Sequence, residues 1–150
     1  IFYGSNGDDV ITCVTGNHTV FGGTGNDKIT GGPGNDILDG GPGNDTLVGR
    51  LGSNVFVFGR GYGHDTVDSY NTQEDRYNLV RLKELLLDDV EFHNIKNGYY
   101  QDLVIKIKNT EDQLNVLRGM DSDANFYIDA IEFGDGSVIT FDELRENDVI

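Results

Sequence analysis

Residues 22–48 read GGTGNDKIT, GGPGNDILD and GGPGNDTLV, three successive nonapeptides that share one pattern of glycine, aspartate and a large aliphatic residue. The same period extends outward, giving six copies from Gly4 to Val57. After Phe58 and Gly59, a seventh copy occupies residues 60–68. A repeat this short indicates a solenoid, in which each unit packs mainly on its neighbours.

Three positions of the nonapeptide carry the pattern. The fourth position is glycine in all seven copies: Gly7, Gly16, Gly25, Gly34, Gly43, Gly52 and Gly63. The eighth position is apolar in all seven: Ile11, Val20, Ile29, Leu38, Leu47, Phe56 and Val67. The sixth position is aspartate in five copies (Asp9, Asp27, Asp36, Asp45 and Asp65), with His18 and Asn54 in the other two.

This pattern predicts a turn followed by a short strand. The glycines permit positive φ angles in the first six residues, and the last three residues place a single side chain inward. Ordering so much glycine costs more conformational entropy than one buried apolar side chain per copy returns. Aspartates stacked in the turns would also repel one another unless a cation lay between them. Calcium prefers carboxylate and carbonyl oxygens, so the pattern indicates calcium as the stabilising cofactor.

The pattern G-G-x-G-x-D-x-U-x, with U a large aliphatic residue, resembles the repeat of the RTX (repeats-in-toxin) family. The resemblance implies an all-β fold, a right-handed parallel β-roll in which one nonapeptide forms half a coil. Each calcium would lie between the turns of copies n and n+2. Copies 1, 3, 5 and 7 would therefore stack on one side, here named the odd side, and copies 2, 4 and 6 on the even side.

In the family, the ligands are the sixth-position side chain and backbone carbonyls of the turn. The resemblance therefore implies a calcium-site set of Ser5, Gly7, Asp9, Gly22, Gly23, Gly25, Asp27, Gly31, Gly32, Gly34, Asp36, Gly40, Gly41, Gly43, Asp45, Gly49, Asn54, Gly61, Gly63 and Asp65. Copy 2 departs from the pattern, because Cys13 and Val14 replace its leading glycines and His18 replaces its aspartate. We expect copy 2 to stack as a strand without forming a good site.

Composition narrows the possible partners. The 150 residues include 26 acidic and 11 basic side chains, for a net charge of -15. That charge argues against nucleic acid or an anionic membrane surface as the main partner. Cys13 is the single cysteine, so no disulfide can form within the chain. The sequence has no apolar run long enough for a transmembrane segment and no signal-peptide pattern at its start, and we expect it to be a piece of a larger protein.

Glycine content divides the chain, because 17 of the 21 glycines fall within residues 1–63. We expect the β-roll to occupy residues 1–68 and a small, mostly-β capping subdomain with short helices to occupy residues 69–150. Residues 55–68 resemble the exit from a final RTX block, similar to the last block of bacterial adenylate cyclase toxin. The remainder is similar to the haemolysin-type calcium-binding-related segment that follows many RTX arrays.

Within the cap, alternation and turn signals predict several elements. Strands are expected over residues 75–80, 90–95, 102–107, 113–117, 126–133 and 138–140. Asn97-Gly98 predicts a hairpin turn. A short helix is expected over residues 81–87, and a capping box of Thr140 and Glu143 predicts a second one ending near residue 147.

Other motifs favour plainer interpretations. Residues 121–132 match several positions of an EF-hand loop, but Phe126 stands where the sharp turn needs glycine, which favours a polar connection. His18, His64 and His93 lack zinc-site spacing, and Cys13 lacks a partner histidine. Cap aromatics are expected in the core or rim, and would be the best candidates for any ligand surface: Tyr99, Tyr100, Phe126, Tyr127 and Phe133.

The expected function is calcium binding rather than catalysis, since no nucleophile–base–acid set is present. We expect a secreted, extracellular module that stays unfolded at low calcium and folds outside the cell. Its partners would be calcium ions, the rest of a larger secreted polypeptide and, by resemblance, the type I secretion machinery. The alternative is a calcium-dependent recognition module that binds carbohydrate or a host surface.

Overall fold

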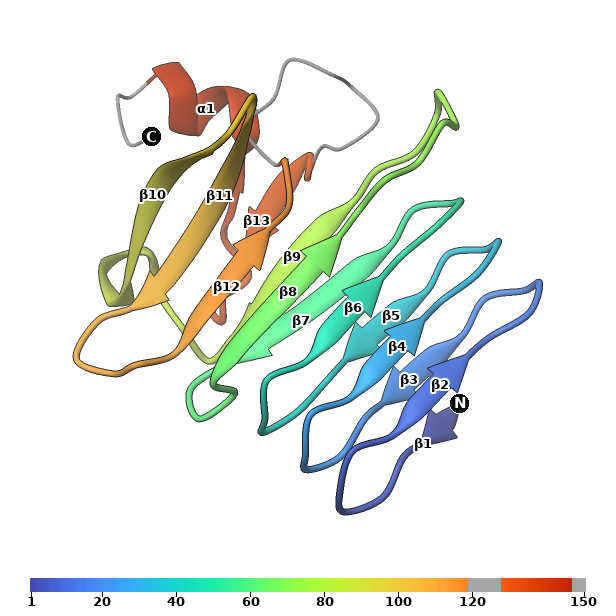
Figure 1. Cartoon of the computed structure of the whole chain (residues 1–150). Coiled ribbons are helices and arrows are strands. Elements are labelled where there is room, and N and C mark those ends of the chain that lie inside the picture. The colour runs from blue at the N-terminus through green and yellow to red at the C-terminus, as the bar shows by residue number, and fades with distance from the viewer. Residues whose placement is uncertain (119–127, 147–150) are drawn as a thin grey trace.

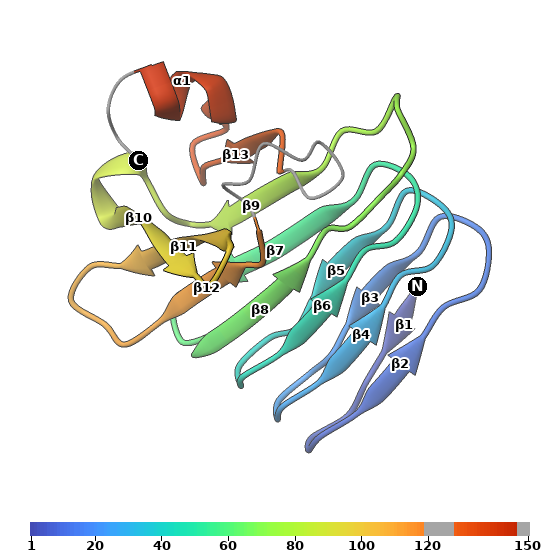
Figure 2. The same ribbon diagram turned by 45° about the horizontal axis from the view of Figure 1, so that its top comes forward.

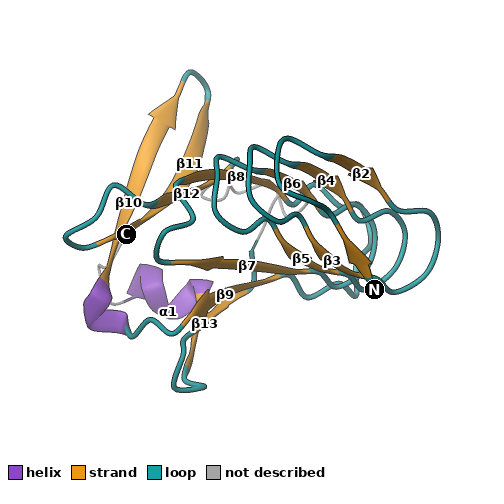
Figure 3. Ribbon diagram, turned by 90° about the horizontal axis from the view of Figure 1, so that it is seen from below, coloured by secondary structure: helices purple, strands orange, loops and turns teal. Residues whose placement is uncertain are grey.

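The computed structural model describes residues 1–118 and 128–146. Its strands form two seven-stranded sheets that lie face to face, as the view along the layers shows (Figure 3). In order across the sheet, with neighbouring strands hydrogen-bonded, the first sheet is β1 (Phe2–Tyr3), β3 (Thr19–Phe21), β5 (Ile37–Asp39), β7 (Val55–Gly59), β9 (Leu79–Lys83), β13 (Ala130–Glu132) and β14 (Val138–Thr140). The second is β10 (Val90–Asn97), β11 (Tyr100–Ile107), β12 (Gln113–Val116), β8 (His64–Asp68), β6 (Thr46–Val48), β4 (Lys28–Thr30) and β2 (Val10–Thr12).

Successive nonapeptides alternate between the two sheets, so that each strand pairs in parallel with the strand two copies away (Figure 1). Ile11 lies opposite Ile29, and Ile29 lies opposite Leu47. The register therefore matches the period of two nonapeptides per coil. The predicted all-β parallel β-roll is confirmed, as is the separation of odd and even copies. Phe2 pairs with Val20, so β1 adds one more parallel strand to the sheet of the even copies.

The core is a double column of eighth-position side chains. Six of the seven are fully buried, and Ile11 in the outermost coil is partly buried. Both columns continue past the repeats, because Val67 pairs with Val116 and Phe56 pairs with Val80. The two sheets thus run without a break from the repeats into β9, β12 and β13 (Figure 2).

The downstream elements follow several of the predictions. β10 and β11 form the expected antiparallel hairpin, and Gly98 at its turn has φ +66°. α1 (Phe141–Glu146) begins at the expected capping box: Thr140 N and Oγ1 donate to Glu143 Oε2, and Glu143 N donates back to Thr140 Oγ1.

One predicted helix was wrong. Residues 81–83 belong to β9, and the only helical turn nearby is a 3-10 turn, η1 (Leu87–Asp89). The reason is parallel pairing on both sides, with β7 and β13, which buries Val80 and Leu82 while Arg81 faces outward to form an ion pair with Glu132. The strand expected over 75–80 begins only at Leu79, and that expected over 126–133 is limited to β13, residues 126–127 lying outside the described part.

Candidate metal centre

The sixth-position aspartates form a hydrogen-bonded ladder along the odd side. Asp9 N donates to Asp27 Oδ1 at 2.8 Å, Asp27 N to Asp45 Oδ1 at 2.7 Å, and Asp45 N to Asp65 Oδ1 at 2.8 Å. Each carboxylate therefore reaches from its own turn to the backbone of the turn one coil earlier. Only one of its two oxygens is used in this way.

The other oxygens have no hydrogen-bond donor. Oδ2 of Asp27, Asp36, Asp45 and Asp65 is buried and unpartnered, and these four residues are between 0 and 2% exposed. A buried carboxylate oxygen without a donor is strongly destabilising. A metal cation at each of these oxygens would remove that penalty.

Backbone carbonyls approach the same places. A Cβ atom added at Gly22 would collide with Asp27 Oδ2 and with the carbonyl oxygen of Gly40 in the next coil. At Gly31 and Gly40, the first obstacle is likewise Oδ2 of the aspartate in the same copy. Glycine at the first position thus leaves a space open between two successive turns. Carboxylate and carbonyl oxygens both face this space. Such a donor set fits calcium.

The fourth-position glycines let the turns stack closely enough for this arrangement. Gly25 has φ +122°, and a Cβ there would lie 2.6 Å from the carbonyl oxygen of Gly7. Gly43 and Gly63 would clash in the same way with the turns before them. Any larger residue would push the coils apart and separate the candidate ligands.

Burial and like charge act on the odd-side carboxylates. Desolvation raises the pKa of Asp45 to about 6, and the neighbouring Asp27 and Asp39 add to the shift. Desolvation raises the pKa of Asp65 further, to about 8, with Asp45, Asp39 and Asp112 contributing. Low-dielectric surroundings disfavour the charged carboxylate, and an adjacent cation favours it. Burial therefore disfavours the charged form of both carboxylates, and a cation bound beside them would restore it.

At the sixth positions of its repeats, the even side carries one carboxylate, Asp36, as expected. Asp36 Oδ1 accepts from His18 N at 2.8 Å and lies 3.1 Å from His18 Nδ1. Burial raises the pKa of Asp36, and its hydrogen bonds to His18 partly offset the rise. Asn54 Oδ1 accepts from Asp36 N at 3.0 Å and so occupies the next step of the ladder. Copy 2 stacks as β3, as its apolar Val20 predicted.

Ser5 and Asp9 in the first turn are placed differently from the later copies. Ser5 N and Oγ donate to Asp9 Oδ2 at 2.7 and 3.0 Å. A Cβ at Gly4 would nevertheless meet the Gly22 carbonyl and Asp9 Oδ2, so the first gap repeats the oxygen pair seen at Gly22.

Sequence reasoning missed two further carboxylates near the odd-side turns. Asp39, at a ninth position, is 8% exposed and accepts hydrogen bonds from the Tyr62 hydroxyl and the Gly41 amide, while burial raises its pKa. Asp112 accepts from the amides of Gly61 and Gly63, each at 2.9 Å, and so clamps the last odd turn from the β11–β12 connection. The nonapeptide pattern contains no signal for either residue.

A second ladder at the fifth position was also missed. Asn26 N donates to Asp8 Oδ1, Asn44 N to Asn26 Oδ1, and His64 N to Asn44 Oδ1. These side chains reach forward to the next coil, whereas the sixth-position carboxylates reach back. The recurring Asn-Asp pair in copies 3, 4 and 5 was the available signal.

The remaining candidates do not assemble into a separate centre. Within residues 1–118 and 128–146, no group of three or more His, Cys, Asp or Glu side chains is placed to share a metal. The stacked turns would instead supply carboxylates singly, together with backbone carbonyls. Cys13 is buried and unpaired with any other cysteine. Of the EF-hand-like segment, residues 121–127 lie outside the described part, and Glu132 is paired with Arg81.

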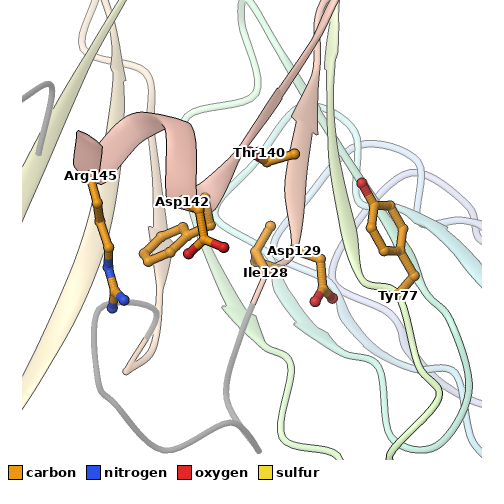
Figure 4. Close-up of a pocket in the computed structure, with 7 residues that line it drawn as sticks. Tyr77, Ile128, Asp129, Thr140, Asp142 and Arg145 are labelled. Carbon is orange, nitrogen blue, oxygen red and sulfur yellow. The ribbon is translucent and has the colours of Figure 1, made fainter. Parts of the chain in front are cut away.

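The aromatic residues of the cap are dispersed. Phe133 is buried, the Tyr100 ring lies 3.9 Å from the Arg118 guanidinium carbon, and Tyr99 is fully exposed. Phe126 and Tyr127 lie outside the described residues. A cavity of about 350 Å³ lies beside β14 and α1 (Figure 4), and its lining includes none of the four unpartnered carboxylates. It is lined by Tyr77, Ile128, Asp129, Thr140, Phe141, Asp142 and Arg145.

Comparison with known proteins finds two stretches of the chain that match family models. Residues 14–64 match the RTX calcium-binding nonapeptide repeat, in three overlapping matches over 14–47, 21–56 and 31–64. Residues 102–143 match the haemolysin-type calcium binding protein related domain. The likeness of residues 55–68 to adenylate cyclase toxin stays a prediction. No helix among the described residues is long and apolar enough to cross a membrane.

A curated relative is the iron-regulated protein FrpA of Neisseria meningitidis serogroup C. It is 37% identical over 94 residues, which are 61% of this chain and 8% of that protein. The chain thus spans a small fraction of this relative's length. RTX repeats bind calcium and form a structural rather than a catalytic fold. The stacked turns, the unpartnered carboxylate oxygens and the matches agree: the chain carries a block of RTX calcium-binding nonapeptide repeats.

Proposed function

We propose that this module is unfolded at low calcium and folds when calcium enters the stacked turns. The observation that carries the proposal is the set of four buried, unpartnered Oδ2 atoms on Asp27, Asp36, Asp45 and Asp65. The folded chain needs positive charge beside them, and the described residues provide little of it there. Binding that occurs only in the folded state stabilises that state by mass action.

The same charge distribution supports a role in export. A chain with net charge -15 repels itself and favours extended conformations when no cation is bound. RTX proteins are typically secreted, and an unfolded chain suits passage through a type I secretion channel. We propose that folding follows outside the cell, where calcium is abundant, and that the module supports folding of a larger secreted polypeptide.

The C-terminal part would close the end of the roll. With the division placed at residue 68, β9 and β12 cover the column ends at Phe56 and Val67, and Asp112 holds the last odd turn. Without these elements, two apolar side chains and two strand edges would face water. Residues 69–150 therefore act as a cap on the calcium-binding repeats.

Calcium titration tests the proposed function. In excess chelator the chain should give a disordered circular dichroism spectrum, and added calcium should restore β-structure cooperatively. The midpoint is expected at about 10⁻⁴–10⁻³ M, the range of extracellular calcium modules. Magnesium is the control and should substitute poorly, since it dehydrates reluctantly and requires octahedral geometry. A native-like spectrum in chelator would contradict the proposal.

The odd side should contribute more to calcium binding than the even side. Asp27 lies between two aspartates in its ladder, whereas Asp36 lies between His18 and Asn54. Asp27→Ala should therefore raise the calcium midpoint about tenfold, equivalent to about 1.4 kcal/mol, and Asp36→Ala should raise it less. Both variants remove one buried carboxylate, so each controls for the other. Equal shifts, or the reverse order, would count against the unequal sides.

Acidity should partly replace calcium. The folded-state pKa values of Asp45 and Asp65, about 6 and about 8, lie above the ordinary value of about 3.9 for an unfolded chain. Protonation therefore stabilises the metal-free fold below about pH 4, and this stabilisation is lost as pH rises through 6 and 8. In chelator, circular dichroism should show more β-structure at pH 5 than at pH 8. Asp65→Asn should weaken this dependence, and greater order at pH 8 would refute it.

A further inference from the structure

The sixth turn, Gly49–Asn54, differs from its neighbours at the atom that faces the cation position. In copies 3, 4 and 5, the atom nearest to a Cβ built on the first glycine is the aspartate Oδ2. In copy 6 the corresponding place beside Gly49 holds Asn54 Nδ2, at 2.8 Å from the built Cβ. An N–H donor thus stands where the turns of copies 3, 4 and 5 present an unpartnered oxygen.

That amide is directed at backbone carbonyls of its own turn. Asn54 Nδ2 donates to the Arg50 carbonyl at 3.2 Å and lies 3.5 Å from the Gly52 carbonyl. Asn71, which follows β8, donates its own Nδ2 to the Gly52 carbonyl at 2.8 Å. Both asparagines are 1% exposed. The carbonyls that would coordinate a cation in this turn therefore accept hydrogen bonds from two side-chain amides.

The turn keeps the shape of the calcium-type turns despite this exchange. Arg50 has φ +70° and Gly52 has φ +96°, as the second and fourth positions require. Gly52 N donates to Gln73 Oε1 at 3.0 Å. Asn54 Oδ1 still accepts from Asp36 N, so the even-side ladder passes through without a carboxylate. Hydrogen bonds to the side chains of Gln73, Asn54 and Asn71 thus anchor the backbone of this turn.

We propose that no calcium binds at the Nδ2 face of Asn54 in the turn Gly49–Asn54, and that the side-chain amides of Asn54 and Asn71 take the place of the cation there. Calcium coordinates oxygen lone pairs, whereas an amide NH₂ group presents only hydrogens. A cation there would have to displace both amides and would leave buried N–H groups unpaired. Asn54 thus determines the metal occupancy of this coil and ends the calcium array on the even side.

This inference rests on the proposed calcium function, and the two can be tested separately. Native mass spectrometry of the whole chain at saturating calcium counts bound ions. Asn54→Ala should retain the wild-type count, because no ion lies at the Asn54 amide. Asp45→Ala should lose at least one. Loss of an ion from Asn54→Ala would overturn the inference, whereas an unchanged count in Asp45→Ala would contradict calcium binding by the odd-side carboxylates instead.

A second pair of variants keeps the test decisive if Asn54→Ala folds poorly. Asn54→Asp retains the oxygen that accepts from Asp36 N and converts the amide into a second carboxylate oxygen. This variant should bind one more calcium than the wild type. Asn35→Asp makes the same charge change at an exposed fifth position on the same side, and should leave the count unchanged. A wild-type count in Asn54→Asp would overturn the role assigned to Asn54.

Discussion

The two oxygens of each ladder aspartate have different surroundings, and the rest of the roll depends on that difference. Oδ1 accepts a backbone amide from the coil before and sets the spacing of the turns. Oδ2 is left buried with no donor beside the open space at a glycine. Because the first bond fixes the position of the second oxygen, the coils and the calcium ligands take up their positions together. Calcium then neutralises charge that the coil spacing itself brings together.

The repeat region could be predicted closely because one physical rule governs it. A period of nine with one inward residue determines strand position, pairing offset and the column from Val20 to Phe56. The cap has no such period, and its local sequence patterns predicted a helix where the structure has a strand. The segment Arg81–Leu87 carries helix-favouring residues, yet Val80 and Leu82 are buried between β7 and β13. Pairing with strands distant in sequence overrode local propensity.

The sequence predicts the carboxylates of the candidate site, but it predicts fewer of the residues that contact them. Sixth-position aspartates follow from the repeat, but Asp39 and Asp112 reach the odd-side turns only through the fold. Asn54 is the converse case, because the repeat pattern predicts it as a ligand. In the structure its amide is instead directed at carbonyls of its own turn. Whether an asparagine oxygen or nitrogen faces a site depends on neighbours such as Asn71, which the repeat does not specify.

A crystal structure of the whole chain grown in calcium would test the central claim most directly. The account predicts cations between successive odd-side turns. Each cation should lie roughly 2.3–2.6 Å, the usual calcium–oxygen distance, from an aspartate Oδ2 and from a turn carbonyl oxygen. Asp27 Oδ2 and the Gly40 carbonyl form the clearest such pair. Anomalous scattering would identify the ions. Odd-side turns stacked as described, with ordered water or protein donors on every Oδ2 and no cation, would contradict the account.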